Sequence, residues 1–210
     1  MPRCQLDHIA ITAPSLEAGA AYVREMLGVS PQPGGEHVCM GTHNLLLRLG
    51  ESMYLEVIAI NPAAPAPTRP RWFGLDTLAA DAAPALSAWV ARTGDIRATA
   101  AAASEPLGDI EPMSRGALEW LITIPADGSL LLGGVAPALI EWHTDAHPAT
   151  RLIDHGLSLV GLELHHPEPQ RVARLLHSLG FEGPVTVAEK SAVAARRVAH
   201  IATPQGVRTL

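Results

Sequence analysis

One pattern that occurs twice constrains the fold of this chain more than any other sequence feature. The segments TAPSLEAGAAYVREMLG, at residues 12–28, and HHPEPQRVARLLHSLGF, at residues 165–181, share the same order of signals. Each runs from the end of a strand through proline into an amphipathic helix that stops at Leu-Gly. An internal repeat of this kind predicts that the chain is built from copies of one supersecondary unit.

The first copy of the unit is predicted over residues 1–60 in the order β-α-β-β-β. Residues 6–12 alternate as a strand does, and Ser15 is placed to cap a helix over 16–27. Three strands are predicted after the helix, at 37–40, 43–49 and 54–60.

Two further copies are predicted after a proline-rich linker at 61–70. The second module, 71–145, is expected to hold a strand at 72–78, a helix at 82–92, and strands at 117–124 and 138–143. The third, 150–210, is expected to hold a strand at 159–165, a helix at 169–179, and strands at 185–189 and 197–202, and is incomplete. We therefore predict an α+β fold of repeated β-α-β-β-β modules packed as one domain.

Composition narrows the class of protein. The 210 residues are 48% hydrophobic and 17% charged, which is typical of a globular chain, and the net charge of −6 disfavours nucleic-acid binding. No apolar run reaches the roughly 18 residues of a membrane span, and residues 1–6 lack the apolar core of a secretion signal. Two cysteines, Cys4 and Cys39, make no disulfide framework. We expect a cytoplasmic protein with neither a nucleic-acid nor a membrane partner.

Three polar residues interrupt apolar strands and are candidates for chemistry. His8 stands in the first strand, Glu56 in the run YLEVIAI, and Glu141 in ALIEWH beside His143. An unpaired buried carboxylate is costly, so Glu56 is expected to face solvent, to form an ion pair, or to bind a ligand. His8 alone is compatible with a satisfied core histidine. Imidazole and carboxylate donors of this kind suit Zn, Mn, Fe or Ni.

Other polar residues are candidates for contact with a small molecule. His43 and Asn44 lie in a polar patch, Arg48 shares a predicted strand face with Asn44, and Arg115 precedes a strand. A hairpin with solvated side chains and structural ion pairs are the alternative explanations. The histidines at 143, 147, 165 and 166 are more typical of exposed turns.

The combination of LDHIAI with YLEVIAI, in β-α-β-β-β order, resembles the vicinal oxygen chelate superfamily. The segments GGEHVCMGTHNLLLRLG, RWFGLD and APALIEWHTDAHPA are similar to its glyoxalase-like domain family. The resemblance implies paired modules whose mixed sheets curl around a cleft. It also implies a divalent metal, held by a first-strand His and a last-strand Glu, that chelates vicinal oxygens and stabilises an enolate or oxyanion.

Carried over residue by residue, the resemblance assigns His8, Glu56 and Glu141 as metal ligands. Glu56 and Glu141 would also be catalytic. The sequence departs from the full pattern, because the first-strand position of the second module is predicted near 73–74 and that of the third near Gly161, where no ligand stands.

Two functions remain open at this point. The first is a divalent-metal-dependent lyase, isomerase or dioxygenase acting on a small substrate with vicinal oxygens. The alternative is a non-catalytic protein that binds or sequesters a small molecule in the same cleft. In either case His43, Asn44, Arg48 and Arg115 are the expected substrate contacts, and a homodimer is compatible with both.

Overall fold

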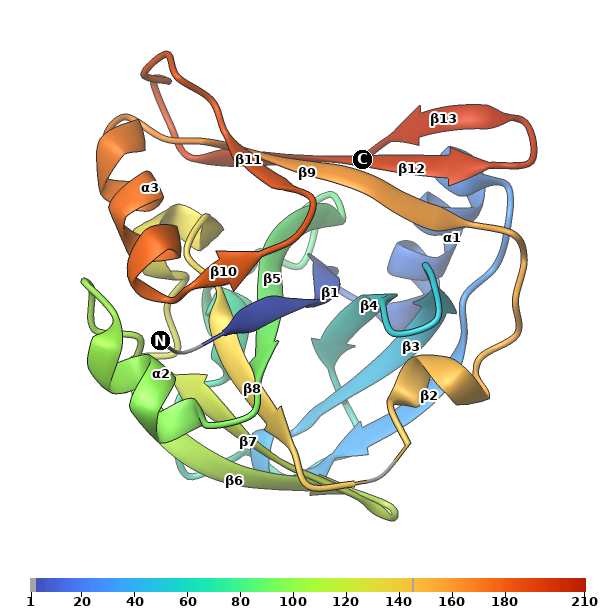
Figure 1. Cartoon of the computed structure of the whole chain (residues 1–210). Coiled ribbons are helices and arrows are strands. Elements are labelled where there is room, and N and C mark those ends of the chain that lie inside the picture. Colours follow the sequence, from blue (N-terminus) through green and yellow to red (C-terminus); the bar gives the residue numbers. More distant parts are fainter. Residues whose placement is uncertain (1–2, 145) are drawn as a thin grey trace.

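A large curled sheet and a smaller sheet packed on its outer face make up the protein (Figure 1). The computed structural model describes residues 3–144 and 146–210. In the large sheet the strands run in the order β2-β3-β4-β1-β5-β8-β7-β6, and the short strand β10 also pairs with β1. The smaller sheet has the order β11-β9-β12-β13. The curled, strand-dominated architecture confirms the predicted α+β fold class.

The first module has the predicted element order. Its elements are β1 (Cys4–Thr12), α1 (Leu16–Leu27), β2 (Gln32–His37), β3 (Thr42–Arg48) and β4 (Tyr54–Ile60). The hydroxyl of Ser15 accepts the backbone N–H of Ala18 at 3.2 Å, and Gly28 ends the helix with a φ of 77°. Residues 38–40, predicted as strand, form one 3₁₀ turn between β2 and β3.

The second module starts later than its sequence suggests. Its elements are β5 (Ala85–Thr93), α2 (Ile96–Ala102), β6 (Asp109–Arg115), β7 (Leu118–Ile124) and β8 (Ala138–Trp142). The helix predicted at 82–92 is wrong, because this segment pairs with β1 along its length as β5. The strand predicted at 72–78 is also wrong, because residues 72–77 form a 3₁₀ segment. Alanine-rich residues favour a helix locally, and here pairing with a neighbouring strand overrides that preference.

The two modules repeat the same strand arrangement around the centre of the sheet. Strands β1 and β5 lie antiparallel to each other, β1 pairs with β4 in parallel, and β5 pairs with β8 in parallel. His8 lies opposite Tyr54 on β4 and opposite Val90 on β5. In the second module Val90 in turn lies opposite Ala138. Val90 therefore occupies in β5 the register position that His8 occupies in β1.

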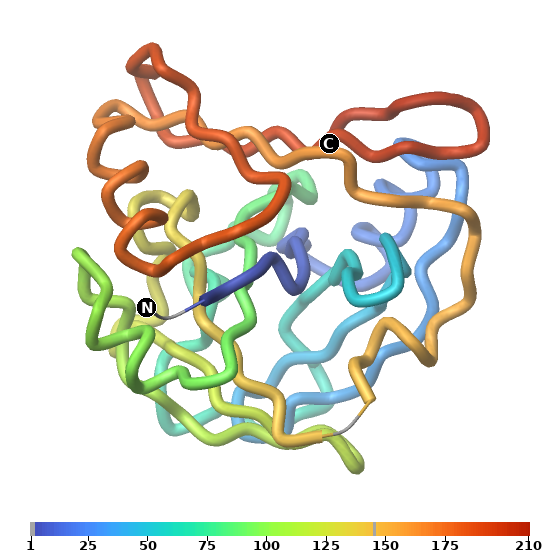
Figure 2. Tube along the Cα trace, in the orientation of Figure 1, coloured from blue at the N-terminus to red at the C-terminus, as the bar shows by residue number. Residues whose placement is uncertain are grey.

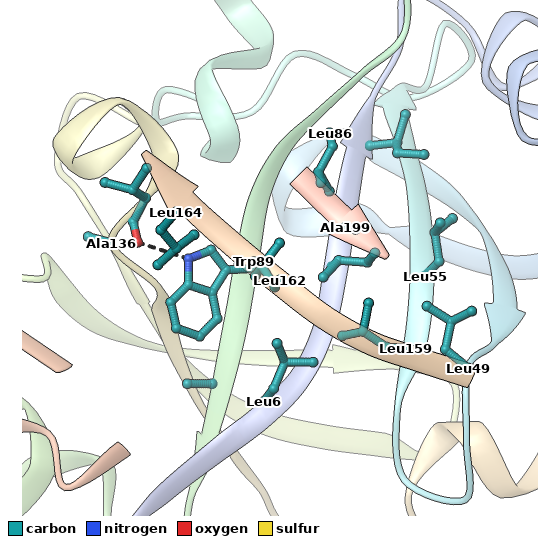
Figure 3. Close-up of a cluster of buried hydrophobic side chains, with 14 of the residues drawn as sticks. Leu6, Leu49, Leu55, Leu86, Trp89, Ala136, Leu159, Leu162, Leu164 and Ala199 are labelled. Carbon is teal, nitrogen blue, oxygen red and sulfur yellow. Dashed lines mark hydrogen bonds between the residues drawn. The ribbon is translucent and has the colours of Figure 1, made fainter. Parts of the chain in front are cut away.

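The third module covers the outer face of the curled sheet. Its elements are β9 (Ser158–His165), α3 (Pro169–Ser178), β10 (Phe181–Glu182), β11 (Val185–Val187), β12 (Arg196–Thr203) and β13 (Gly206–Thr209). Leu159 and Leu162 of β9 pack with Leu55 and Trp89 of the large sheet (Figure 3). The indole N–H of Trp89 donates to the carbonyl of Val135 at 2.9 Å, so this core leaves no polar atom of Trp89 unpaired.

The inner face of the large sheet holds a second apolar cluster, which includes Ile58, Val90, Trp120 and Ile140. The curl brings the two edge strands, β2 and β6, toward each other, as the trace in Figure 2 shows. Among the described residues, no helix is long and apolar enough to cross a membrane. The concave face is thus the place where polar side chains that interrupt the apolar strands of the two modules can meet.

Candidate functional site

A cavity on the inner face joins a polar end to aromatic walls. Its polar residues are His8, His37, Glu56 and Arg115, and its aromatic residues are Tyr54, Trp72, Phe73, Trp120 and Trp142. The free space among these side chains, about 20 Å³, has room for one water molecule. A larger ligand requires a side chain to move. Phe73 is a candidate, since it is only partly buried and its φ of 57° is unusual for a residue with a side chain.

Glu56 is the carboxylate at the polar end of this cavity. It is 5% exposed, and the Asn44 side-chain amide donates to its Oε1 at 2.5 Å. His8 Nε2 lies 3.6 Å from its other oxygen, Oε2. The ring of His8 stacks on Tyr54 with centroids 4.5 Å apart. The carboxylate and the imidazole are therefore fixed in orientation by neighbours while both face the cavity.

Asp7 orients His8 from behind. The pairing of β1 with β5 shifts register between Leu6 and His8, and this bulge turns Asp7 into the protein, where it is 0% exposed. Asp7 Oδ1 accepts from His8 Nδ1 at 2.6 Å. The other ring nitrogen of His8 is thereby left to face Glu56.

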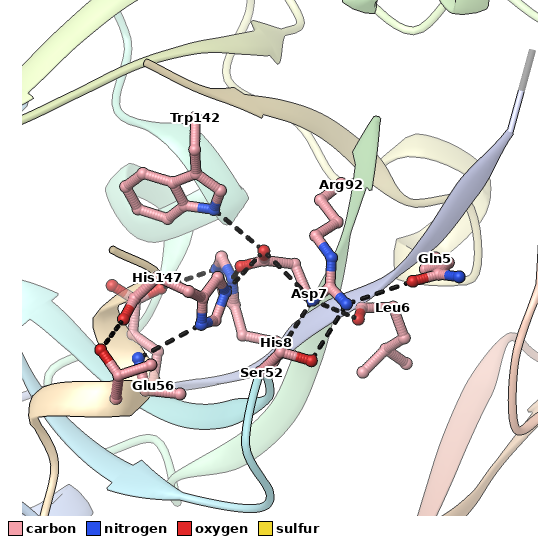
Figure 4. Close-up of polar contacts among 11 residues, drawn as sticks. Gln5, Leu6, Asp7, His8, Ser52, Glu56, Arg92, Trp142 and His147 are labelled. Atoms are coloured by element: carbon pink, nitrogen blue, oxygen red, sulfur yellow. Dashed lines mark hydrogen bonds and ion pairs between the residues drawn. The ribbon is translucent and has the colours of Figure 1, made fainter. Parts of the chain in front are cut away.

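The second oxygen of Asp7 gathers three more groups (Figure 4). Asp7 Oδ2 accepts from His147 Nε2 and from the indole N–H of Trp142, both at 2.9 Å, and Arg92 lies 3.9 Å away. Burial alone raises the pKa of Asp7, but the hydrogen bonds from His147 and His8 outweigh burial and hold that pKa well below its usual range. Asp7 is therefore a buried carboxylate anion at neutral pH.

Sequence reasoning missed Asp7 and His147. Strict alternation places Asp7 on the face opposite His8, and only the bulge reverses this. His147 follows β8 in a segment that reads as a turn, yet it is partly buried against Tyr54 and Trp142. The one available signal was the adjacency of Asp7 and His8 in the sequence.

His37 is a second buried histidine on the cavity wall. Burial lowers its pKa to about 4, so it is neutral at physiological pH. Its Nδ1 lies 3.1 Å from the hydroxyl of Thr42. Two buried polar atoms nearby, Asn44 Oδ1 and Trp72 Nε1, have no hydrogen-bond partner among the described residues. Trp72 lines the cavity, whereas Asn44 Oδ1 lies against Gly34 of β2.

The structure does not bring Glu141 to His8 and Glu56. Ile140 and Trp142 line the cavity, so Glu141 between them points to the other face of β8. There its Oε2 accepts the backbone N–H of Ile96 at 2.7 Å, and its Oε1 lies 2.9 Å from His143 Nε2. The expected convergence of three ligands is therefore wrong for Glu141, which binds the first turn of α2.

The four expected substrate contacts divide into two pairs. Arg115 lines the cavity, and Asn44 lies behind the cavity wall, where it donates to Glu56. Arg48 instead donates to the carbonyl of Gly50 at 3.1 Å and reaches toward Asp154. His43 alternates with Asn44 along β3, so its side chain points away from the cavity.

The donors at the cavity do not fit a divalent metal centre. His8, His37 and Glu56 line the cavity, but they are not arranged as the three protein ligands of a catalytic zinc site. In the second module Val90 occupies the register position of His8. Ile140, two residues beyond the partner of Val90, occupies that of Glu56. Among residues 3–144 and 146–210, no group of three or more His, Cys, Asp or Glu side chains is arranged to hold a metal ion.

Three solved structures are similar to this chain at low sequence identity, and the first of them shares its fold. A crystal structure of a hypothetical protein from Staphylococcus aureus has a TM-score of 0.62 and 11% identity, covering 92% of this chain and 88% of that chain. A Streptomyces coelicolor methylmalonyl-CoA epimerase variant in complex with 2-nitronate-propionyl-CoA has a TM-score of 0.43 and 20% identity, covering 67% and 96%. A methylmalonyl-CoA epimerase from Mycobacterium tuberculosis has a TM-score of 0.41 and 17% identity, covering 65% and 86%.

The family comparison covers most of the chain. A search among curated proteins found no match. The sequence profile of the glyoxalase-like domain matches residues 6–180, which include the first two modules and the strand and helix that begin the third. The chain belongs to the glyoxalase-like domain family.

Proposed function

We propose that this protein binds a small carbonyl compound in the inner-face cavity and catalyses proton transfer on it. One observation carries the proposal: the buried carboxylate of Glu56 is held by Asn44 at 2.5 Å and faced by His8 at 3.6 Å inside aromatic walls. A carboxylate positioned in this way is suited to general acid–base catalysis.

In the proposed reaction Glu56 accepts a proton from the carbon beside the carbonyl group. The electron pair of the broken C–H bond forms the enolate double bond, and negative charge develops on the carbonyl oxygen. In its doubly protonated form, with Nδ1–H bonded to Asp7, His8 donates a hydrogen bond from Nε2–H to that oxygen. Return of the proton to carbon or to oxygen gives the epimer, the tautomer or the solvent-exchanged substrate. The apolar walls strengthen these interactions by excluding water.

The family resemblance implies a more specific function, that of a metal-dependent lyase, isomerase or dioxygenase. The proposal does not use a metal, since His8, His37 and Glu56 are not arranged as a three-ligand set among the described residues, and the matching positions of the second module are Val90 and Ile140. Both cysteines are free thiols, which is usual in a reducing compartment and supports the proposed location in the cytoplasm.

The test uses methyl phenylpyruvate in deuterium oxide, with loss of its CH₂ signal followed by NMR. The wild type should exchange this position faster than buffer alone, and Glu56→Gln should lose at least about 100-fold of that acceleration. Glu141→Gln, which removes a carboxylate outside the cavity, is the matched control and should retain the full rate. Treatment with a chelator should leave the wild-type rate unchanged.

Tryptophan fluorescence gives an independent measure of binding, because Trp72, Trp120 and Trp142 line the cavity. Quenching by methyl phenylpyruvate without exchange would contradict catalysis and support the non-catalytic binding function. Exchange that survives Glu56→Gln, or that disappears with the chelator, would overturn the assignment of Glu56 as a metal-free base.

A further inference from the structure

We propose that the natural ligand carries an anionic group, and that Arg115 binds this group at the seam between the edge strands β2 and β6. The inference rests on the proposed function, since it concerns the same cavity, and it names the class of substrate as an organic acid with a carbonyl group. Four observations lead to it.

The first observation is that Arg115 connects two spaces. It lines the inner cavity together with Glu56, and it also lines an outer groove of about 510 Å³. Arg151 lies on the same groove, and Glu36 is the carboxylate facing it. A ligand whose carbonyl group reaches Glu56 and whose other end remains in the groove must pass the guanidinium of Arg115.

The second observation is the way the seam is built around this side chain. Arg115 is the last residue of β6, and its stem packs on Gly35 of β2. A Cβ at position 35 would lie only 2.8 Å from Arg115 Cδ, and Gly35 has a φ of 151°. The absence of a side chain at 35 is therefore what lets Arg115 lie across the seam.

The third observation is that Arg115 has no carboxylate partner among the described residues. Other arginines do: Arg69 pairs with Glu111 at 2.7 Å, and Arg171 with Glu105 at 2.7 Å. A guanidinium at the mouth of a cavity presents a fork of N–H donors that matches the two oxygens of a carboxylate.

The fourth observation is that the charge of Arg115 acts on the interior. Burial is the main cause of the lowered pKa of His37, and the positive charge of Arg115 lowers it further. Since Arg115 and Glu56 also line the same cavity, one small molecule in it can contact both side chains.

The experiment compares phenylpyruvate with its methyl ester, which differ in one negative charge. Affinities are measured by quenching of tryptophan fluorescence at low salt. The wild type should bind the acid roughly tenfold more tightly than the ester. Arg115→Gln should lose this preference while its affinity for the ester stays within about twofold, and Arg115→Lys should keep part of it. Arg174→Gln, the same charge change on an exposed residue of α3, is the matched control and should keep it in full.

Equal affinity of the wild type for acid and ester would overturn the inference without any variant. So would a preference that survives in a folded Arg115→Gln protein, with folding checked by circular dichroism. These outcomes differ from failure of the proposed function, in which neither compound exchanges deuterium even where the acid binds more tightly. If inorganic phosphate at millimolar concentration displaces the ester as well as the acid, the anion site is not separate from the carbonyl site, which also contradicts the inference.

Discussion

The two halves of the curled sheet have the same strand arrangement and opposite chemistry. In the first half, β1 and β4 present His8 and Glu56 to the cavity. In the second half, β5 and β8 present Val90 and Ile140 at the matching register positions. The repeat therefore fixes where side chains can meet, while the residue at each position decides whether they form a polar site or an apolar wall.

The difference extends to the residues behind the cavity. In the first half the bulge at Asp7 builds a buried network with His8, His147 and Trp142. In the second half the corresponding carboxylate chemistry is at the surface, where Asp95 caps α2 and Glu141 accepts from its first turn. In the first half Asp7 and Glu56 therefore build the cavity, whereas in the second half Asp95 and Glu141 bind the N-terminus of α2.

The largest expected effect comes from making the second half resemble the first. Val90→His with Ile140→Glu would add one imidazole and one carboxylate to His8 and Glu56, and we expect the double variant to bind one Zn²⁺ per chain. Without zinc, two polar groups buried without partners should cost roughly 2–6 kcal/mol of unfolding free energy. Elemental analysis and thermal unfolding with and without zinc measure both effects. The wild type is the control, and zinc bound equally by the wild type would contradict the metal-free interpretation.

Removing the buried network of the first half should have the next largest effect. Asp7→Ala leaves His8, His147 and Trp142 without their shared acceptor, and we expect a loss of about 3–5 kcal/mol in urea unfolding. Asp95→Ala in the second half removes only a helix cap and should cost about 1 kcal/mol. Similar losses of unfolding free energy in the two variants would show that the buried network around Asp7 stabilises the protein no more than a helix cap does.

The buried His37 of the first half should also make the free energy of unfolding depend on pH. His37 has a pKa of about 4 in the folded protein, whereas an unfolded histidine has one near 6.5. The unfolded chain therefore takes up the proton first on acidification. The contribution of His37 to stability is complete above about pH 6.5 and falls by up to about 3 kcal/mol as the pH drops to 4.

His37→Leu should flatten this dependence between pH 6.5 and 4, as measured by urea unfolding at several pH values. His177→Leu, at an exposed position of α3, is the control and should leave the slope unchanged. Asp7 acts in a lower range. Because its folded pKa lies below the unfolded value of about 3.9, its contribution is present above that value and is lost as the pH falls further. A wild-type slope that His37→Leu does not change would disprove the assignment.

The smallest expected effect concerns the seam where the halves meet. Gly35→Ala puts a methyl group against the stem of Arg115 in a backbone conformation that favours glycine, and should cost about 1 kcal/mol and weaken the preference for the acid a few-fold. Gly94→Ala is the matched control, since a Cβ there meets open space at an ordinary φ. An unchanged acid preference in Gly35→Ala would mean that Arg115 does not depend on the seam.

The sequence predicted the first and third modules better than the second. The helix at Leu16–Leu27 and strand β4 carry strong local signals, namely a cap, a glycine stop and a dense run of apolar residues. The segment Ala85–Thr93 has none of these, and its alanines favoured a helix. Its strand conformation comes from pairing with β1 on one side and β8 on the other, which no local pattern encodes.

By itself, the sequence determined the class of fold and the polar residues His8 and Glu56 within apolar strands, because periodicity and interruptions of apolar runs are local properties. Only the tertiary structure decided which exceptions share a site. The register between distant strands places Val90 opposite His8 and puts Ile140 at the position that matches Glu56. A one-residue bulge turns Asp7 inward, and alternation along β8 turns Glu141 away. Each of these depends on how strands far apart in the chain align, and a shift of one residue exchanges the two faces of a strand.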